Sequence, residues 1–221
     1  MGSLLVKNVS YSYHNQFQTV HALNGVSAWF EPGKMYAVTG ASGSGKTTFL
    51  SLLAGLDVPE CGSIEWEGAS TAAMDRDRYR RESTSVIYQN FNLFQHLTVL
   101  ENAAYPLYMR EMPKKEADAV AREKLLTVGL KEGQFNRLPN MLSGGEQQRV
   151  AIARALASGS KIILADEPTG NLDSENGKNI VEILKRLAHE ENCCVVIVTH
   201  DHNTAGEADV VLKMRDGRLD A

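Results

Sequence analysis

The sequence predicts an α/β fold with a mixed sheet at its core, an N-terminal antiparallel β-subdomain and a helical subdomain inserted in the middle. Three observations lead to this prediction. Short, fully apolar strands alternate with amphipathic helices in the last third, which is typical of a parallel sheet covered on both faces. The first third alternates β-rich runs with turns. Between these regions, from about Leu97 to Leu130, the pattern becomes helical.

The β-rich runs of the first third read "SLLVKNVSYSY", "GVSAWFEPG", "KMYAVTG" and "GSIEWEG". Because turn residues separate them at short intervals, they suggest a partly antiparallel sheet at the N-terminal side. A further strand, Ser85–Gln89, precedes the helical region. We expect one domain over residues 1–221, in which the helical subdomain occupies approximately residues 90–158.

The last third begins with a strand at Lys161–Ala165 and continues with a helix at roughly Ser174–Glu190 and a strand at Cys194–Thr199. The helix is amphipathic because its apolar residues recur at i, i+3, i+4, i+7 and i+8, namely Ile180, Ile183, Leu184, Leu187 and Ala188. Near the end of the chain, Asp216-Gly217 predicts a tight hairpin turn.

Composition narrows the class of protein. The net charge of −4 gives no electrostatic case for binding nucleic acid. Apolar runs such as Val195–Val198 are far shorter than the ~20 residues that span a bilayer, and the N-terminus lacks the basic start and apolar core of a signal peptide. Cys61, Cys193 and Cys194 have no zinc spacing, so we expect buried thiols in a reducing cytosol. We therefore expect a cytosolic protein unless a partner holds it to a membrane.

The segment "MYAVTGASGSGKTTFLSLLAGL" predicts a phosphate-binding loop between a strand and a helix, because Gly40, Gly45, Lys46 and Thr47 satisfy G-x-x-x-x-G-K-S/T. The glycines allow successive N–H groups to turn inward onto a phosphate, and the helix N-terminus adds roughly half a positive charge. Lys46 would reach the β- and γ-phosphates and the Thr47 hydroxyl would ligate Mg²⁺. The expected nucleotide-binding residues here are Gly40, Ala41, Ser42, Gly43, Ser44, Gly45, Lys46, Thr47 and Thr48.

The run "KIILADEPTG" predicts the acidic part of the same site. A buried apolar strand that ends in Asp166 is what a phosphate-loop protein needs to hold Mg²⁺. Glu167, beside it, could polarise the attacking water as a general base. The two motifs support each other because parallel strands deliver their C-terminal ends to one edge of the sheet.

Gln89 and His200 extend this set because each ends a predicted strand. If both strands belong to the same sheet, their side chains emerge beside the γ-phosphate. Gln89 can then contact Mg²⁺ or the attacking water, and His200 can hydrogen-bond a γ-phosphate oxygen. A surface or capping role is the alternative for a histidine at a strand end.

The stretch "LSGGEQQR" has a simple structural interpretation, since Ser143 and Glu146 form the S-x-x-E pattern of a capping box for a helix at Gly145–Ala157. A capping box does not require the two glycines that follow the serine. Ser143 and the unpaired N–H groups of the helix start therefore also suit a second anion site. Such a site makes sense if it closes over the γ-phosphate bound to another subunit.

Taken in order, "GASGSGKTT", Gln89, "LSGGEQQR", "IILADE", "NLD" and His200 resemble the motifs of the ATP-binding subunit of ABC transporters. The resemblance covers essentially the whole chain, from Leu4 to about Leu219, and implies the ABC-type P-loop NTPase fold. It implies an ATPase that uses ATP and Mg²⁺, forms a head-to-tail homodimer in the ATP-bound state and serves an integral membrane permease from the cytoplasmic face. It implies no binding of nucleic acid.

The resemblance also implies roles for individual residues. Ser143, Gly144 and Gly145 would contact the γ-phosphate bound to the partner, and Asp173 would link the two sites across the interface. Tyr13 would stack on adenine, with Tyr11 as the alternative if the register differs by two. In the family, the aromatic-rich region after Gln89 receives a short helix of the permease, so Phe91, Leu93 and Phe94 would include partner contacts as well as residues of a small local core.

The phrases "DEPTGNLDS", "LLAGLD" and "KMRDGRL" resemble the ATPases of macrolide exporters, lipoprotein-release systems and antimicrobial-peptide resistance transporters. This implies efflux or extraction of a hydrophobic compound, peptide or lipoprotein by mechanical transmission. The alternative is an ATPase that regulates a membrane partner in cell-envelope remodelling or division without transport. A chromosome-maintenance ATPase would need a long coiled-coil insertion and a ribosome-acting factor would need two such domains, and neither is present in this sequence.

Overall fold

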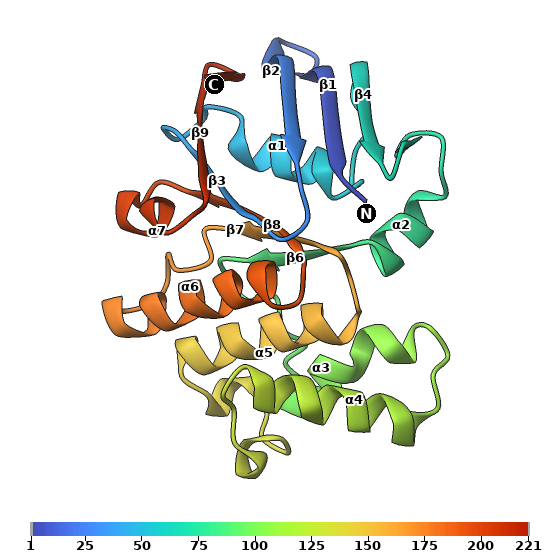
Figure 1. The fold of residues 1–221 in the computed structure, drawn as a ribbon, viewed down its shortest axis with the longest axis vertical. Helices are drawn as coiled ribbons and strands as arrows, with labels where there is room; N and C mark the ends of the chain where they lie inside the picture. The colour runs from blue at the N-terminus through green and yellow to red at the C-terminus, as the bar shows by residue number, and fades with distance from the viewer. Residues whose placement is uncertain (1, 221) are drawn as a thin grey trace.

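The computed structural model describes residues 2–220 and contains two sheets with helices between and below them (Figure 1). The strands are β1 Leu4–His14, β2 Thr19–Phe30, β3 Met35–Thr39, β4 Cys61–Trp66, β5 Ala69–Ser70, β6 Thr84–Tyr88, β7 Ile162–Asp166, β8 Cys194–Thr199, β9 Val210–Arg215 and β10 Arg218–Asp220. The α-helices are α1 Lys46–Leu53, α2 Arg76–Glu82, α3 Val99–Tyr108, α4 Lys114–Thr127, α5 Gly144–Ala157, α6 Ser174–His189 and α7 His202–Gly206.

The larger sheet has six strands in the order β10-β9-β3-β8-β7-β6. Strands β9, β3, β8, β7 and β6 run parallel, and β10 returns antiparallel to β9. The hairpin between β9 and β10 turns at Asp216 and Gly217, which both have positive φ, as the sequence predicted. The parallel strands bring the residues that follow β3, β7 and β8 to one edge of the sheet.

The smaller sheet is antiparallel, with the order β2-β1-β4-β5. This confirms an antiparallel β-subdomain at the N-terminal side. The run "KMYAVTG" forms β3 in the larger sheet, because its buried residues suit a central parallel strand, and this agrees with an N-terminal region that is only partly antiparallel. One detail of the prediction was wrong. Strand β2 begins at Thr19, well before the predicted run, although several of its first residues are exposed.

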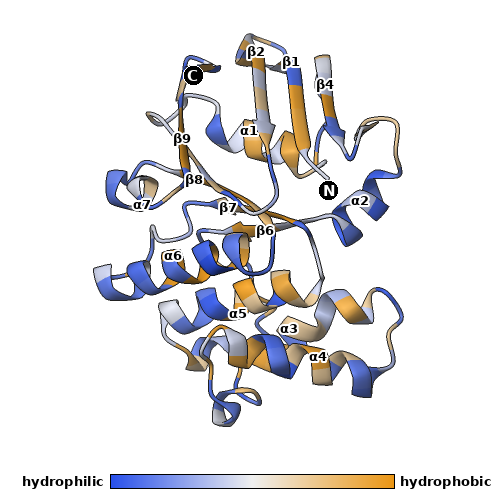
Figure 2. Ribbon diagram, viewed as in Figure 1, coloured by the Kyte–Doolittle hydropathy of each residue, from blue (hydrophilic) through white to orange (hydrophobic). Residues whose placement is uncertain are grey.

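The two faces of the larger sheet pack into two separate cores, since alternate residues of a strand point to opposite sides. Met35, Ala37 and Ile163 face a core made with α3, α4, α5 and α6. Tyr36 and Val38 face a second core made with α1 and the antiparallel sheet. In Figure 2 the apolar colour is strongest along the strands and on the inward sides of the helices. The strongly amphipathic α6 covers the first of these faces, as predicted.

The chain between β6 and β7 forms α3, α4 and α5, which confirms an inserted helical region (Figure 1). Helix α3 starts with a capping box, in which Thr98 and Glu101 exchange hydrogen bonds. Two short helices were not predicted. Helix α2 is capped by Asp75 and helix α7 by Asp201, and both are too short for a clear periodic pattern. Within residues 2–220, no helix combines the length and apolar character needed to cross a bilayer.

The prediction that all three cysteines are buried was wrong for Cys61, which begins β4 at the exposed end of that strand. Cys193 and Cys194 are buried on opposite faces of the larger sheet, as their adjacent positions in an extended chain require. Burial raises the pKa of the Cys194 thiol to about 12. It also raises the pKa of Cys193.

We predict that Cys61 alone reacts quickly with a thiol reagent in the native protein at pH 8, because only a solvent-accessible thiolate is nucleophilic. Ellman's reagent should titrate one thiol in native protein and three in guanidinium chloride. A Cys61→Ser variant should show almost no fast reaction. Rapid modification of two or three thiols in the native state would contradict the burial of Cys193 and Cys194.

Candidate functional site

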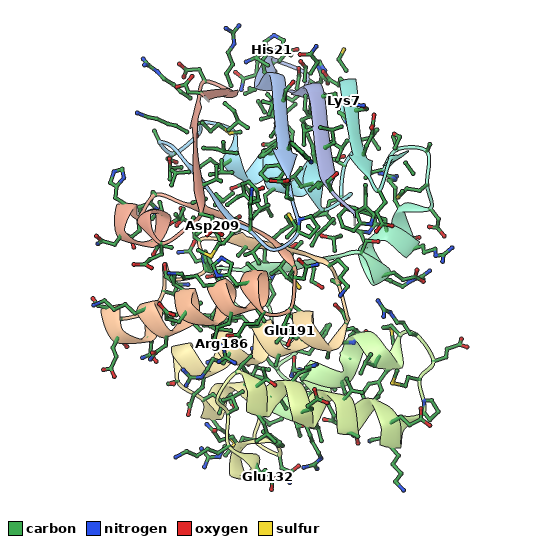
Figure 3. The ribbon with its side chains drawn as sticks, in the orientation of Figure 1. Lys7, His21, Glu132, Arg186, Glu191 and Asp209 are labelled. Carbon is green, nitrogen blue, oxygen red and sulfur yellow. The ribbon has the colours of Figure 1, made fainter. Side chains whose placement is uncertain are left out.

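A cleft of about 700 Å³ lies at the edge of the larger sheet where β3, β7 and β8 end. It is formed by the loop between β3 and α1, by the residues that follow β7 and β8, and by one side of the antiparallel sheet. His21, labelled on β2 in Figure 3, belongs to that side. The lining residues are Tyr13, Val20, His21, Ala22, Ser42, Gly43, Gly45, Lys46, Thr47, Thr48, Asp166, Glu167, Val198 and His200.

The loop before α1 depends on glycine where it passes closest to another segment. Gly45 has φ +105°, and a Cβ at this position would lie 2.4 Å from the carbonyl oxygen of Ala22. Both the backbone conformation and the space therefore exclude a side chain. Helix α1 begins at the next residue, Lys46, so the unpaired N–H groups of its first turn lie at the cleft.

The Lys46 side chain folds back over this loop. Its Nζ donates hydrogen bonds to the carbonyl oxygens of Gly40 at 2.8 Å and Ala41 at 2.9 Å. Lys46 is buried, so the ammonium group is held at the centre of the loop with its charge directed at the cleft. A concave backbone, a helix N-terminus and a fixed ammonium together favour a polyphosphate.

Asp166 ends β7, and its carboxylate lies near the Thr47 side chain at the start of α1. Partial burial is the main cause that raises the pKa of Asp166, and the neighbouring carboxylate of Glu167 raises it further. Hydrogen bonding to Thr47 and the charge of Lys46 act in the opposite direction. A nearby cation would stabilise the charged form of a carboxylate in this position.

The oxygen atoms of Asp166 and Thr47 are of the kind that Mg²⁺ prefers. Across residues 2–220 there is no group of three or more His, Cys, Asp or Glu side chains arranged to hold a metal. Mg²⁺ is usually held by one or two protein oxygens together with phosphates and water.

Glu167 is held more tightly than any other acidic group at the cleft. Its Oε2 accepts from the Thr199 hydroxyl at 3.1 Å, and its Oε1 lies 3.1 Å from the backbone N of His200 and 2.7 Å from His200 Nδ1. The backbone of Glu167 has φ +47°, a conformation that is uncommon for a residue with a side chain. This geometry aims a largely buried carboxylate at the end of the sheet, while the His200 side chain remains 72% exposed.

Tyr13, and not Tyr11, lies at the cleft. Its hydroxyl is 3.1 Å from the Thr48 hydroxyl, and its ring is 48% exposed. Tyr11 packs edge-on against Tyr13 with ring centroids 5.1 Å apart, and on its other side it contacts the core beneath the antiparallel sheet. The two tyrosines lie on the same side of β1, because they are two residues apart in the strand, but only Tyr13 is far enough along it to reach Thr48 of α1.

Gln89 does not line the cleft. Its side chain donates a hydrogen bond to Asn171 Oδ1 at 3.3 Å, and Asn171 in turn donates to the Gln89 carbonyl oxygen at 3.1 Å. A Cβ at Gly170 would lie 2.7 Å from Gln89 Nε2, so the glutamine side chain packs directly on the segment that follows Glu167. The structure thus brings Gln89 next to the loop of Glu167 without placing it in the cleft.

The "LSGGEQQR" segment also lies outside the cleft. Ser143 caps α5, and the Ser143 N–H and Glu146 Oε2 are joined at 2.7 Å, as the capping-box pattern predicted. The second glycine has a packing role that the capping-box pattern does not reveal. A Cβ at Gly145 would lie 2.5 Å from Asn176 Oδ1, because the start of α6 presses against the start of α5 there. Gly144 has no such constraint within the chain, since its nearest atom, in Leu172, is 3.4 Å from an added Cβ.

Asp173 caps α6 through hydrogen bonds from the backbone N–H groups of Glu175 and Asn176, at 3.1 and 2.9 Å. Sequence reasoning missed His21 and Ala22, which line the cleft, and the buried Thr199, whose hydroxyl holds the Glu167 carboxylate. Thr199 directly precedes His200 and could have been considered. The contribution of β2 had no signal in the sequence, because those residues carry no motif.

The fold and the cleft define a class of protein. The sheet is mostly parallel, and a glycine-rich loop and a helix follow its strand β3. The adjacent acidic residues Asp166 and Glu167 lie at the end of β7, which is separated from β3 by β8. This is the arrangement of a P-loop nucleoside-triphosphatase. Residues 23–170 match the sequence model of the ABC transporter family. The chain belongs to this family, as its resemblance predicted, and is an ABC-type ATPase.

Similar proteins and structures support this assignment over nearly the whole chain. The chain is 37% identical over 217 residues to the uncharacterized ABC transporter ATP-binding protein YclH of Bacillus subtilis, covering 98% of this chain and 95% of YclH. It is 42% identical over 222 residues to the macrolide export ATP-binding/permease protein MacB of Neisseria gonorrhoeae, covering 99% of this chain. The chain spans only 34% of the length of that MacB.

The ABC transporter cassette MJ0796 of Methanocaldococcus jannaschii, solved as a dimer, superposes with a TM-score of 0.90 at 39% identity. The alignment covers 99% of this chain and 97% of that one. A second dimeric structure of MJ0796, in a post-hydrolysis state with ADP and Pi, gives the same TM-score at 38% identity. These likenesses confirm the predicted ABC-type fold, in which the antiparallel and mixed sheets are combined with an inserted helical region.

Proposed function

We propose that this chain pairs head to tail with a second copy of itself, hydrolyses ATP at two composite sites and thereby powers a separate membrane permease. One observation carries the proposal. The cleft contains the phosphate loop, Asp166, Glu167 and His200, whereas the exposed Ser143 and the uncrowded Gly144 lie elsewhere and have no role within their own cleft. The dimeric structure of MJ0796 supports such a pairing by similarity.

In the proposed site, the phosphate loop from Gly40 to Thr48 and the ammonium of Lys46 bind the β- and γ-phosphates of ATP. Thr47 and Asp166 would hold Mg²⁺, and Gln89 would approach it from the neighbouring segment when the site is assembled. The metal would neutralise charge that develops on the phosphates. The position of Thr47 and Asp166 supports this assignment, because both side chains lie beside the loop in the same cleft.

Glu167 would accept a proton from the attacking water, and His200 would contact a γ-phosphate oxygen. The three hydrogen bonds on Glu167 fix the direction of its carboxylate, so the group needs no reorganisation during the reaction. The exposed ring of His200 leaves its Nε2 free for a ligand while Nδ1 pairs with Glu167.

The second half of each site would come from Ser143, Gly144 and Gly145 of the partner, whose serine hydroxyl and helix N–H groups would contact the γ-phosphate. Asp173, at the start of α6, would link the two sites across the interface. The negative charge of ATP draws two positive helix ends together, and hydrolysis releases them, so the dimer closes and opens with each cycle.

Tyr13 would stack on the adenine ring, which accounts for an exposed aromatic side chain at the cleft. Stacking contributes ~1–3 kcal/mol per base, so Tyr13→Ala should weaken ATP binding roughly tenfold. Tyr13→Phe keeps the ring, loses only the hydrogen bond to Thr48 and should bind ATP almost normally. Equilibrium binding of a fluorescent ATP analogue measures both. If Tyr11→Ala weakened binding and Tyr13→Ala did not, the assignment would move to Tyr11.

The proposed permease would dock in a groove of about 340 Å³ between the sheet edge and the helical region. Exposed apolar side chains at its rim, Leu56 and Met109, suit a helix of a partner. Phe94 is 43% exposed and stacks on Tyr105 of the groove, whereas Leu93 is buried and Phe91 packs against the core. Of the three residues considered from the sequence, Phe94 is therefore the best candidate for partner contact.

The similarity to a macrolide export protein supports efflux. We infer that the cargo is a hydrophobic compound, peptide or lipoprotein, which is exported or extracted, and that ATP energy is transmitted mechanically through a permease with few membrane helices. Such a complex would hold this chain at the cytoplasmic face of the membrane. MacB is named as a single ATP-binding/permease protein, which supports the expectation that a permease also serves this chain.

Affinity capture tests this function directly. Tagged Glu167→Gln protein is purified from membranes of its native host with Mg-ATP, and the co-purifying proteins are identified by mass spectrometry. A permease with few membrane helices and a large external domain supports mechanical efflux or extraction. If that external domain belongs to envelope remodelling or division machinery, the result favours an ATPase that regulates a membrane partner without transport. A many-helix permease overturns the mechanical assignment alone. Capture of only soluble proteins or nucleic acid overturns the permease proposal.

A further inference from the structure

The hairpin turn at Asp216 and Gly217 contacts the phosphate loop from the far end of the chain. The backbone N–H of Gly217 donates a hydrogen bond of 3.0 Å to the carbonyl oxygen of Ser44. Gly217 has φ +73° and Asp216 has φ +48°, so the turn between β9 and β10 presents this N–H directly to the loop. Figure 1 shows the C-terminal end of the chain close to β2 and the segment before α1.

Strand β2 completes the contact. The Gly217 carbonyl oxygen accepts a hydrogen bond of 2.8 Å from the backbone N–H of Asn24, and Asn24 Nδ2 donates to the Asp216 carbonyl oxygen at 3.1 Å. The Ala22 carbonyl oxygen lies 2.4 Å from an added Cβ at Gly45 and 2.7 Å from one at Gly217. The backbone at Ala22 therefore fits between two glycines, one in the phosphate loop and one in the hairpin turn.

The direction of the Ser44 carbonyl determines the direction of the next N–H. In a trans peptide the C=O of one residue and the N–H of the following residue point in opposite directions. Because Gly217 holds the Ser44 carbonyl on the side of the hairpin, the Gly45 N–H points the other way, toward the cleft that Gly45 lines. This N–H is one of the groups expected to contact a phosphate.

We propose that the Asp216–Gly217 turn and Asn24 form a positioning element that holds the Ser44–Gly45 peptide in its phosphate-binding orientation and so sets the affinity for ATP. The proposal rests on the proposed function, since it assumes that this loop binds the phosphates of ATP. None of the three residues lines the cleft. Gly40 adds a further close contact to the same hairpin, because a Cβ there would lie 2.2 Å from the Met214 carbonyl oxygen.

The chain provides a matched control for testing this element. The turn between β4 and β5 has the same backbone conformation at these two positions, with Glu67 at φ +53° followed by Gly68 at φ +81°. A Cβ at Gly68 meets no atom within 4 Å, whereas a Cβ at Gly217 meets the Ala22 carbonyl oxygen at 2.7 Å. Gly68→Ala and Gly217→Ala therefore carry the same kind of backbone strain, and only the second displaces the turn from the phosphate loop.

The experiment compares dissociation constants for ATP and ADP with the thermal midpoint of the nucleotide-free protein. We expect Gly68→Ala to lower the midpoint and leave both constants unchanged, and Gly217→Ala to weaken both nucleotides about tenfold. Asn24→Ala removes the side-chain donor without adding strain, so it should weaken ATP about threefold with a nearly normal midpoint. This milder variant keeps the test decisive if Gly217→Ala folds poorly.

If the ATP dissociation constants of Gly217→Ala and Asn24→Ala are both within twofold of that of Gly68→Ala, the proposed positioning role is overturned. Lys46→Ala, measured in parallel, separates this result from failure of the proposed function. Loss of ATP binding in Lys46→Ala together with normal binding in Gly217→Ala and Asn24→Ala rejects only the positioning role. A wild-type protein that does not bind ATP, or a Lys46→Ala variant that binds it normally, rejects the nucleotide site itself.

Discussion

Glu167→Gln should lower the turnover number for ATP by at least ~100-fold while leaving ATP binding intact, because general-base catalysis typically contributes a factor of ~10²–10⁴. Glutamine has the same shape as glutamate, and its carbonyl oxygen can accept the hydrogen bond that the His200 N–H now donates to Glu167. The variant loses the negative charge and the capacity to take a proton. Steady-state phosphate release and equilibrium ATP binding measure the two effects separately.

The same variant should accumulate as an ATP-bound dimer, because the step that opens the proposed dimer is blocked. Light scattering after gel filtration with and without Mg-ATP should show the monomer mass only without nucleotide. Glu65→Gln is a suitable control, since Glu65 pairs with Lys7 on the antiparallel sheet and has no contact with the cleft. Hydrolysis by Glu167→Gln near the wild-type rate would remove Glu167 from the role of general base.

Ser143→Arg should abolish ATP hydrolysis even though its own cleft is intact, because the bulky cation replaces a serine that we assign to the partner's site. Thr98→Arg is the matched control: Thr98 begins α3 with a capping box of the same kind, so both changes remove a cap worth ~1 kcal/mol. The control should lose stability to a similar extent and keep its hydrolysis. Turnover numbers and thermal midpoints of the two variants are compared.

Mixing gives the sharper test of head-to-tail pairing. Lys46→Ala and Ser143→Arg should each be inactive alone, but a mixed dimer contains one site with both defects and one with neither. Random pairing of equal amounts makes half of the dimers mixed, so about a quarter of the wild-type activity should return if the sites act independently. A Ser143→Arg protein that hydrolyses ATP normally by itself would show that each cleft is complete within one chain.

The sequence was a good guide wherever a feature is local. The phosphate loop between β3 and α1, the capping box at Ser143 and the hairpin turn at Asp216-Gly217 were predicted at their observed positions, since each depends on residues within one turn or one helix start. The amphipathic period of α6 was equally clear. The fold class followed from these elements and from the alternation of apolar strands with helices.

The sequence could not show where distant segments meet. Whether Tyr13 or Tyr11 reaches the cleft depends on where α1 packs along β1, and the need for glycine at position 145 depends on Asn176 at the start of another helix. Backbone contacts such as Gly217 to Ser44 leave no pattern of residue types at all. These features exist only after packing brings the segments together.

By itself, then, the sequence determined the class of fold, the family and the chemical groups available at the cleft, because periodicity, turn chemistry and short motifs are encoded in neighbouring residues. The tertiary structure alone decided which of those groups share one cleft. It turned Gln89 toward Asn171, left Ser143 exposed and placed the C-terminal turn against the phosphate loop. The physical reason is that these relations depend on strand order and on close packing between residues far apart in the chain.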